Sequence, residues 1–316
     1  MVLETLKKYL PNYSSQYPIG FQRILEAFSE EYKLIDEDID ILWDAYQFGE
    51  KAHKNQKRKS GVPYFEHCIE VCIQLISWNM DLDTLIAGLL HDTIEDTLVT
   101  KKEIQTQFNK DIGNLVFGVS KLSGIKFRDQ QHKQAENLMK MFLAVAKDLR
   151  VIIIKFSDRL HNMKTLEYLK KEKQIRIANE TRDVYAPLAH RLGMNKLKME
   201  YEDLTFEVLN NKHFNEIKKK VNATNKQRVR YINNFIKSIE EELKNYDIVA
   251  NVFGRAKHFY SIFNKMKLQT LTFNELYDLL AIRIIVEDID ECYTVLGIIH
   301  QLYTPVQNKF KDYIAT

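Results

Sequence analysis

The segment LLHDTIEDT, residues 89–97, decides the fold and carries the strongest chemical signal of the sequence. It closes a run, DTLIAGLLHD (83–92), that is apolar nearly all round and therefore typical of a helix buried on every side. His91 and Asp92 would end this helix, where an imidazole and a carboxylate are costly unless something compensates their burial. A divalent metal ion is sufficient, and this pair of ligands suits manganese, iron or zinc better than calcium.

Two more carboxylates follow at helical spacing. Glu95 lies four residues after His91. Asp96 lies four residues after Asp92, so the pattern predicts all four groups on adjoining faces of one helix. Carboxylates beyond the ligands are what metal-assisted hydrolysis uses to orient and deprotonate water. A lone HD dipeptide is common, however, and by itself is a weak motif for a metal site.

A second polar row lies in FSDRLHNMKTL, residues 156–166. Asp158, Asn162 and Thr165 follow i, i+4, i+7 spacing, which predicts one helix face with a candidate ligand followed by substrate contacts. A further candidate ligand, His67, is placed by the pattern on the helix that follows the basic loop KNQKRKSGVP (54–63).

Each of these residues also has a plainer interpretation. His67 alone is more typical of a hydrogen-bonded helix histidine, and Asp158 beside Arg159 of a surface ion pair. His161 has an apolar neighbour and fits a packed residue as well as a functional one. The basic loop by itself fits a solvated surface segment. The combination, rather than any single member, favours a metal centre.

The rest of the chain is predicted to be mostly helical. Amphipathic spacing predicts helices over 36–50 and 64–77, and Thr100 with Glu103 has the form of a capping box that starts another. Residues 151–154 are β-branched and read locally as a strand, although the sequence after them favours a helix. A charged helical stretch is predicted over 173–246. Strands are predicted after it over 247–253 and 280–286, and helices over 256–267 and 289–302.

Composition limits the class of protein. Hydrophobic residues make up 45% of the 316 and charged residues 28%, as in soluble globular proteins, and only 10 Gly and 5 Pro favour helices. The net charge of +3 is too small to indicate nucleic-acid binding. Three cysteines form no even framework, no signal peptide is recognised, and no run approaches the roughly 20 apolar residues that span a bilayer. A cytoplasmic protein without a membrane partner is predicted.

Taken in order, these strings resemble a known family closely, from about residue 40 to residue 316. The resemblance is to the Rel/SpoT enzymes, bifunctional synthetase/hydrolases of the alarmone (p)ppGpp. Their hydrolase is an all-helical domain of the HD superfamily. The strings that carry the resemblance are AHKNQKRKSGVPYFEHCIEV (52–71), LLHDTIEDT (89–97), GVSKL (118–122), QAENLMKM (134–141), IKFSDRLHNMKTL (154–166) and ETRDVYAPLAHRLG (180–193).

The resemblance implies roles for the candidate residues, with (p)ppGpp as substrate. It implies a manganese ion held by His67, His91, Asp92 and Asp158. The family's first ligand follows the PY dipeptide, which selects His67 over His53. Glu95 and Asp96 would be the catalytic pair. The nucleotide contacts would be Arg58, Lys59, Ser60, Asn162 and Thr165.

This chain departs from the family pattern at two positions beside the ligands. Cys68 stands where the family usually has proline, and Ser157 stands where it usually has alanine. Neither change removes a ligand. Members that lack hydrolysis typically lose HD or ED residues, and this chain keeps all of them.

The strings FGRAKHFYSIFNKM (253–266), ELYDLLAIRIIV (275–286) and KFKDYIA (309–315) resemble the opening of the family's synthetase domain. That domain transfers pyrophosphate from ATP to GDP or GTP. The resemblance implies ATP-phosphate, magnesium and substrate roles for Arg255, Lys257, Lys265, Asp278 and Lys311. Without the family these residues fit surface charges on a small α/β unit. Because the sequence ends at Thr316, before the family's guanine-stacking tyrosine, we expect no alarmone synthesis and no magnesium requirement.

The expected architecture is mainly α. An HD-type hydrolase domain over 1–195 and a helical connector over 196–245 would precede an incomplete, nucleotidyltransferase-like α/β synthetase domain over 246–316. Ribosome contact would need the family's regulatory domains, which this sequence does not contain. Two other functions remain open, namely an HD phosphohydrolase for another nucleotide and an idle regulator that senses alarmone or docks on a ribosome.

Overall fold

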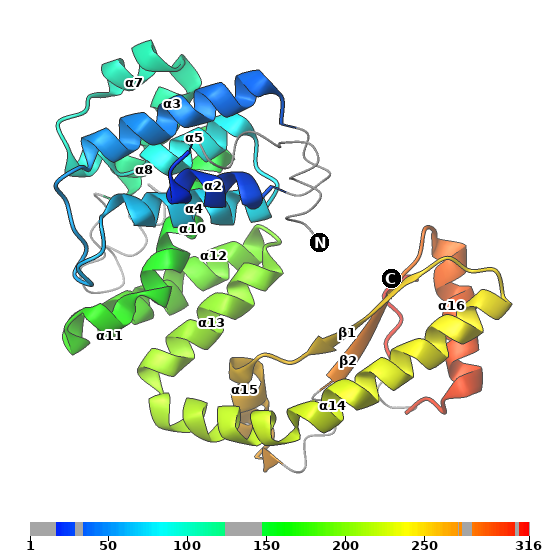
Figure 1. The fold of residues 1–316 in the computed structure, drawn as a ribbon. Helices are drawn as coiled ribbons and strands as arrows, with labels where there is room; N and C mark the ends of the chain where they lie inside the picture. The colour runs from blue at the N-terminus through cyan, green and yellow to red at the C-terminus, as the bar shows by residue number, and fades with distance from the viewer. Residues whose placement is uncertain are drawn as a thin grey trace. The chain divides into compact units, whose positions relative to one another are not determined.

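The chain forms two compact units, residues 1–205 and 206–316, in a computed structural model (Figure 1). The structure describes residues 17–28, 34–123, 147–270, 272–273, 280–306 and 310–315. The predicted QAENLMKM string and Asp278 lie outside the described residues. Each unit is described by itself, and the mainly α fold class predicted from the sequence is confirmed.

The first unit is all helical in its described part. Its helices are α2 (Ile19–Glu26), α3 (Asp36–Ala52), α4 (Phe65–Ser77), α5 (Leu82–Leu90), α6 (Thr93–Asp96), α7 (Lys101–Gln107), α8 (Lys110–Ser123), α10 (Leu149–Lys164), the 3₁₀ turn η1 (Leu166–Tyr168), α11 (Lys171–Glu180), the π-helical turn η2 (Thr181–Tyr185), α12 (Ala186–Arg191) and α13 (Asn195–Leu209), which runs past the unit boundary.

Helix α5 lies at the centre of this unit, in contact with α3, α4, α8 and α10 (Figure 1). Every residue of α5 from Thr84 to Leu90 is buried, so the prediction of a helix covered on all sides is confirmed. Asp81 caps its start by accepting a hydrogen bond from Thr84 N at 3.1 Å. The predicted capping box of Thr100 and Glu103 is also present at the start of α7.

The β-branched residues 151–154 lie in a helix, α10, rather than in a strand. Ile152 and Ile154 are fully buried, and α10 packs against both α4 and α8. Helical periodicity of apolar residues over the whole of α10 therefore outweighs the local strand propensity of four residues.

The prediction of one continuous helix through residues 91–96 is wrong. Helix α5 ends at Leu90, residues 91 and 92 form a turn, and α6 begins at Thr93. Side chains replace helical N–H groups at this junction. The His91 ring nitrogen Nδ1 lies 2.8 Å from Gly88 O, and Thr93 Oγ1 donates to Leu90 O at 2.6 Å. These bonds satisfy carbonyls in the last turn of α5, so the chain can change direction.

The second unit contains a two-stranded antiparallel sheet. Strand β1 (Asn251–Ala256) pairs with β2 (Leu280–Ile285), with Asn251 opposite Ile285 and Ala256 opposite Leu280. The helices of this unit are α14 (Asn211–Asn245), α15 (Phe259–Gln269) and α16 (Ile289–Leu302). Helix α14 contacts β1, β2, α15 and α16, so it supplies one side of both small apolar clusters in this unit.

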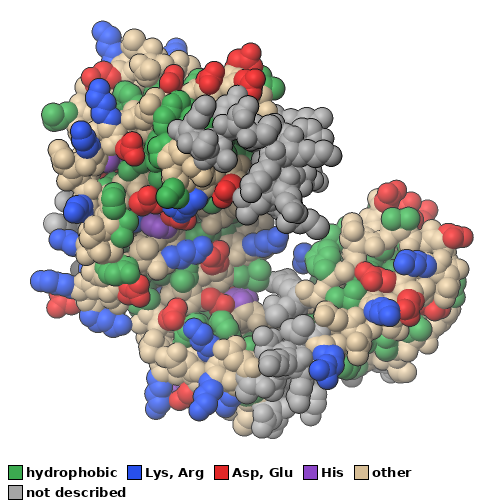
Figure 2. Space-filling view, viewed as in Figure 1, with side chains coloured by type: hydrophobic (Ala, Val, Ile, Leu, Met, Phe, Trp, Pro, Cys, Tyr) green, Lys and Arg blue, Asp and Glu red, His purple; other side chains and the backbone are tan. Residues whose placement is uncertain are grey.

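The surface carries mixed charge. On the face seen in Figure 2, Lys and Arg side chains alternate with Asp and Glu side chains, and no sign dominates. None of the described helices has the length and apolarity needed to cross a bilayer. Any binding of a highly charged ligand must therefore depend on a local cluster of charges.

The close packing of α5 on α4 gives a stability prediction. A Cβ added at Gly88 would overlap Leu75 Cδ1, and Leu75 is fully buried. Gly88→Ala should therefore destabilise the first unit by about 1–3 kcal/mol, although alanine has the better helix propensity. Gly297→Ala in α16 is the control, because a Cβ there meets nothing within 4 Å. Urea unfolding measures both, and an equally stable Gly88→Ala would contradict the packing argument.

Candidate metal centre and adjoining pocket

Three helical segments bring imidazoles and carboxylates to one point in the first unit. His67 comes from α4, His91 and Asp92 from the junction of α5 and α6, and Asp158 from α10. Ligand atoms of His67, His91 and Asp158 all lie within 4.8 Å of one another. All four side chains are buried, in segments up to 91 positions apart in the sequence.

The spacing between these groups is that of a ligand cluster. His67 Nε2 lies 3.2 Å from Asp158 Oδ1 and 3.7 Å from Asp92 Oδ2. His91 Nε2 lies 3.0 Å from Asp92 Oδ2 and 4.0 Å from Asp158 Oδ1. Both histidines therefore direct the same ring nitrogen, Nε2, toward both carboxylates.

Hydrogen bonds on the other ring nitrogens fix the tautomers. His91 Nδ1 donates to Gly88 O, which leaves its Nε2 without a proton in the neutral ring. His67 Nδ1 lies 2.6 Å from His161 Nδ1, which also lies 3.0 Å from Arg58 Nη1. A guanidinium can only donate, so His161 Nδ1 accepts, and His67 Nδ1 is the donor. Both Nε2 atoms are then bare lone pairs, as metal-ligating histidines require.

The charge balance of the cluster calls for a cation. His91 Nε2 is fully buried and has no hydrogen-bond partner among the described residues. Burial opposes a charge on His91, but Asp92 outweighs it and raises the pKa of that imidazole well above its ordinary value, so without a metal ion a proton on Nε2 would supply the positive charge. A buried acceptor facing carboxylates at 3–4 Å is stable only with positive charge between them. The donor set of two imidazoles and two carboxylates fits a divalent transition metal.

Asp158 is held by two residues of its own helix, one on each carboxylate oxygen. Lys155 Nζ, itself buried, lies 2.6 Å from Asp158 Oδ2, and Asn162 Nδ2 donates to Oδ1. Burial raises the pKa of Asp158, but Lys155 and His67 outweigh it, and the pKa falls well below its ordinary value. Asp158 is therefore an ionised carboxylate in a fixed orientation.

Glu95 and Asp96 lie beside the cluster rather than in it. Both line a small cavity of about 250 Å³ together with Asp92 and Asp158. Both are exposed side chains on α6. Tyr64 OH lies 2.8 Å from Asp96 Oδ2 and 2.7 Å from Asp92 Oδ2, so one hydroxyl bridges the candidate ligand and the candidate acid.

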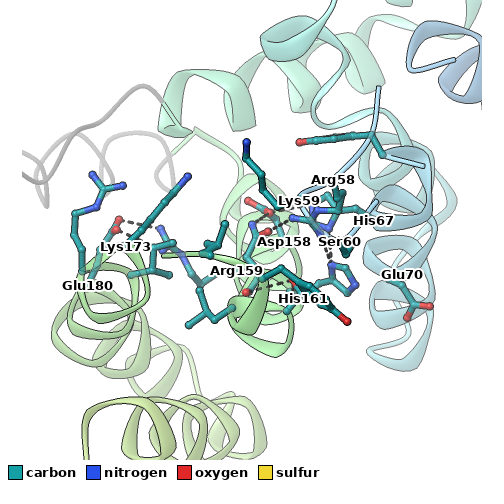
Figure 3. A pocket seen from close by; sticks show the side chains of 18 of the residues that line it. Arg58, Lys59, Ser60, His67, Glu70, Asp158, Arg159, His161, Lys173 and Glu180 are labelled. Carbon is teal, nitrogen blue, oxygen red and sulfur yellow. Dashed lines mark hydrogen bonds and ion pairs between the residues drawn. The ribbon is translucent and has the colours of Figure 1, made fainter. Parts of the chain in front are cut away.

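A larger cavity of about 1490 Å³ opens next to the cluster, and Figure 3 looks into it. The basic loop supplies Arg58, Lys59 and Ser60, and α10 supplies Asn162, followed by Thr165 at its C-terminal cap. Arg58 also donates to Asn162 Oδ1, so the loop and α10 are joined across the cavity. The residues proposed from the sequence as substrate contacts thus line one cavity with His67 and Asp158.

Several residues of this cavity were not identified from the sequence. The sequence patterns do not single out Lys155 or Tyr64, and they fit a packed role for His161 as well as a functional one. On the far wall, α11 contributes Lys173 and Arg176, for which no ion pair is found in the described part of the chain. The IKFSDRLH spacing does place Lys155 one turn before Asp158, a usable signal.

The remaining candidates lie in the second unit. Arg255 is on β1 opposite Ala281, Lys257 follows that strand, Lys265 is on α15, and Lys311 lies in the exposed C-terminal segment. Asp278 is outside the described residues. The synthetase roles proposed for them stay predictions.

Comparison with known proteins agrees with this geometry. A family model described as an HD domain matches residues 45–195, and one described as a region found in RelA / SpoT proteins matches residues 254–316. The protein is therefore an HD-domain protein with a RelA/SpoT region.

Curated relatives make the assignment more specific. The chain is 45% identical over 282 residues to an Escherichia coli protein named bifunctional (p)ppGpp synthase/hydrolase SpoT, covering 89% of this chain and 40% of that protein. It is 44% identical over 283 residues to a Myxococcus xanthus GTP pyrophosphokinase, covering 89% and 37%. It is 44% identical over 273 residues to a Spiroplasma citri guanosine-3′,5′-bis(diphosphate) 3′-pyrophosphohydrolase, covering 86% and 36%. The chain belongs to the Rel/SpoT family and spans about two fifths of these relatives' length.

A solved structure from a study of a metazoan SpoT ortholog that hydrolyses ppGpp also matches. It covers 56% of this chain and 97% of that one, with 21% identity and a TM-score of 0.40. That likeness is too low to support an argument about fold or function.

Proposed function

We propose that the first unit is a metal-dependent phosphohydrolase that removes the 3′ pyrophosphate of (p)ppGpp, giving GDP or GTP and pyrophosphate. The observation that carries the proposal is the convergence of His67, His91, Asp92 and Asp158 beside a cavity walled by cations. The names of the Escherichia coli and Spiroplasma citri relatives support the substrate.

The four clustered residues would hold one divalent cation, for which we propose manganese. When bound, such an ion supplies Lewis acidity and brings the pKa of a coordinated water toward neutrality. His161 and Lys155 would keep His67 and Asp158 in orientation through the contacts described above. An imidazole whose other nitrogen donates a hydrogen bond is a better ligand, since ring rotation is restricted and basicity rises.

Glu95 and Asp96 would act on the attacking water. Both carboxylates are exposed in the small cavity next to the cluster, where either is able to accept a proton from water. The 3′ phosphoryl group would be attacked and the bond to the ribose oxygen broken, with pyrophosphate as one product. The two acids line the same small cavity as Asp92 and Asp158, so both lie next to the cluster.

Cations on two walls would bind the polyphosphate. Arg58 and Lys59 come from the loop, and Lys173 and Arg176 from α11. Guanidinium and ammonium groups are the usual partners of phosphate oxygens, and those without an internal ion pair are available to a ligand. The cavity exceeds the roughly 300–1,000 Å³ of typical ligand pockets. It therefore has room for a guanosine that carries two diphosphate groups.

One experiment tests the proposal. The purified chain, freed of metal by chelation, is incubated with ppGpp with and without manganese, and the nucleotides are separated. Manganese-dependent formation of GDP and pyrophosphate is expected. Tight binding of ppGpp without product would favour a sensor instead, and turnover of other nucleotides but not ppGpp would indicate another HD phosphohydrolase.

The role of Arg58 gives a separate prediction. Its guanidinium reaches both His161 and Asn162, which a lysine ammonium cannot do with one planar group. Arg58→Lys should raise KM for ppGpp about tenfold, because the charge remains while the fork is lost. Lys54→Ala is the control, since Lys54 is exposed and does not line the cavity. An unchanged KM in Arg58→Lys would remove Arg58 from the binding wall.

A further inference from the structure

The two residues that close the base of the basic loop are Gln56 and Tyr64. Tyr64 N donates to Gln56 O at 3.0 Å, and one step further in, Arg58 N donates to Val62 O at 2.9 Å. Gly61 turns the tip with a φ of +86°, a left-handed conformation that favours glycine. Gln56 and Tyr64 therefore set the geometry of the loop that carries Arg58.

The side chains of the same two residues both reach Asp96. Gln56 Nε2 donates to the backbone carbonyl of Asp96 at 2.6 Å. Tyr64 OH lies 2.8 Å from Asp96 Oδ2. Asp96 is thus held at its main chain by one end of the loop and at its carboxylate by the other.

A buried histidine orders both anchors. His53 Nδ1 lies 2.8 Å from Gln56 Oε1, which fixes the amide so that its NH₂ group points to Asp96. The His53 ring also stacks on the Tyr64 ring, with centroids 5.0 Å apart and planes at 21°. His53 is only 2% exposed, so its ring is held in place by the surrounding packing.

Asp96 needs such anchors because its own element is weak. Helix α6 is a single turn of four residues, and the next residue, Thr97, is extended with φ −134° and ψ −172°. One isolated turn has too few backbone hydrogen bonds to persist unaided. Asp96 is also exposed, so packing does not fix its rotamer.

We propose that Gln56 and Tyr64 are positioning residues that lock Asp96 and thereby couple the substrate-binding loop to the catalytic turn. Only the effect on ppGpp hydrolysis rests on the proposed function; the anchoring of Asp96 does not. A loop ordered by the nucleotide would hold Gln56 and Tyr64 in place, and these would hold Asp96 against the cluster. Tyr64 would act through Asp96 and would not itself touch the reacting atoms.

The first test measures how firmly the turn that carries Asp96 is held, and it does not depend on enzymatic activity. Amide hydrogen exchange is followed by mass spectrometry in peptides covering residues 92–98 of wild type, Tyr64→Phe and Gln56→Leu. Faster exchange in these peptides is expected in both variants. Tyr201→Phe and Gln22→Leu are matched controls, because Tyr201 OH and Gln22 Nε2 each donate to a backbone carbonyl elsewhere in the unit. Unchanged exchange in both test variants overturns the proposal, whether or not ppGpp is a substrate.

The second test is a double-mutant cycle on ppGpp hydrolysis. Tyr64→Phe keeps the ring stacked on His53 and should lower kcat about tenfold to a hundredfold at saturating manganese. Manganese is kept saturating because Tyr64 OH also lies 2.7 Å from Asp92 Oδ2, so its loss should weaken metal binding as well. In an Asp96→Asn background the same substitution should cost nothing more, because its target is already lost. If the loss of kcat in the double variant equalled the product of the losses in the two single variants, Tyr64 would not act through Asp96. Absence of wild-type hydrolysis would instead reject the proposed function and leave the exchange result to decide the inference.

Discussion

Replacing Asp92 with alanine is expected to abolish cation retention and turnover together. Asp92 Oδ2 lies 3.0 Å from His91 Nε2 and 3.7 Å from His67 Nε2, so its loss opens the cluster to water on one side. Even outer partners of metal ligands contribute about 10–100-fold to affinity, so loss of a ligand should exceed a hundredfold. Titration calorimetry with manganese and pyrophosphate release on ppGpp measure the two effects.

The control for this change is Asp111→Ala, an exposed acid in the first turn of α8. It should leave both manganese affinity and hydrolysis as in wild type. An Asp92→Ala protein that is folded by circular dichroism and still binds manganese as tightly as wild type would remove Asp92 from the ligand set.

Glu95→Gln and Asp96→Asn are expected to slow hydrolysis while manganese binding is kept. Both carboxylates are exposed on α6, whereas the four proposed ligands are buried, so manganese affinity should be kept. Loss of the group that accepts the proton from water should lower kcat by about 10²–10⁴-fold. Single-turnover hydrolysis of ppGpp at saturating manganese measures the chemical step directly.

The two substitutions also test which acid takes the proton. Both amides keep the shape of the side chain but replace one acceptor oxygen with an NH₂ donor, and neither amide takes up a proton near neutral pH. The variant with the larger loss of kcat therefore identifies the acid that accepts the proton. If either variant lost manganese as severely as Asp92→Ala, the division between ligands and catalytic acids would be wrong.

Much of the fold could be predicted from periodicity. Helix patterns at 36–50 and 289–302 correspond to α3 (Asp36–Ala52) and α16 (Ile289–Leu302), because amphipathic spacing records which face is buried. The break between α5 and α6 could not be predicted in this way. It depends on side-chain bonds from His91 and Thr93 to carbonyls, and such bonds leave no periodic signal.

The sequence predicted the candidate ligands of the site, but it did not predict the residues that hydrogen-bond to them or to Asp96. HD and SDRLHN strings point to His91, Asp92 and Asp158 because charged groups in apolar helices need a partner. The role of His161 depends on His67, which is 94 positions away, and the local sequence does not contain that contact. The anchors on Asp96 come from Gln56 and Tyr64, which are 40 and 32 positions away.

The buried Lys155 compensates the charge of one of the two acids in this centre. Its ammonium already neutralises Asp158, although burial opposes its charge, and that pairing raises the pKa of Lys155. A site made only of acids would repel itself until an ion arrived, and folding would then wait for metal. Here one of the two acids has a partner supplied by the chain. A bound metal ion would therefore have to balance the charge of Asp92 rather than that of both acids.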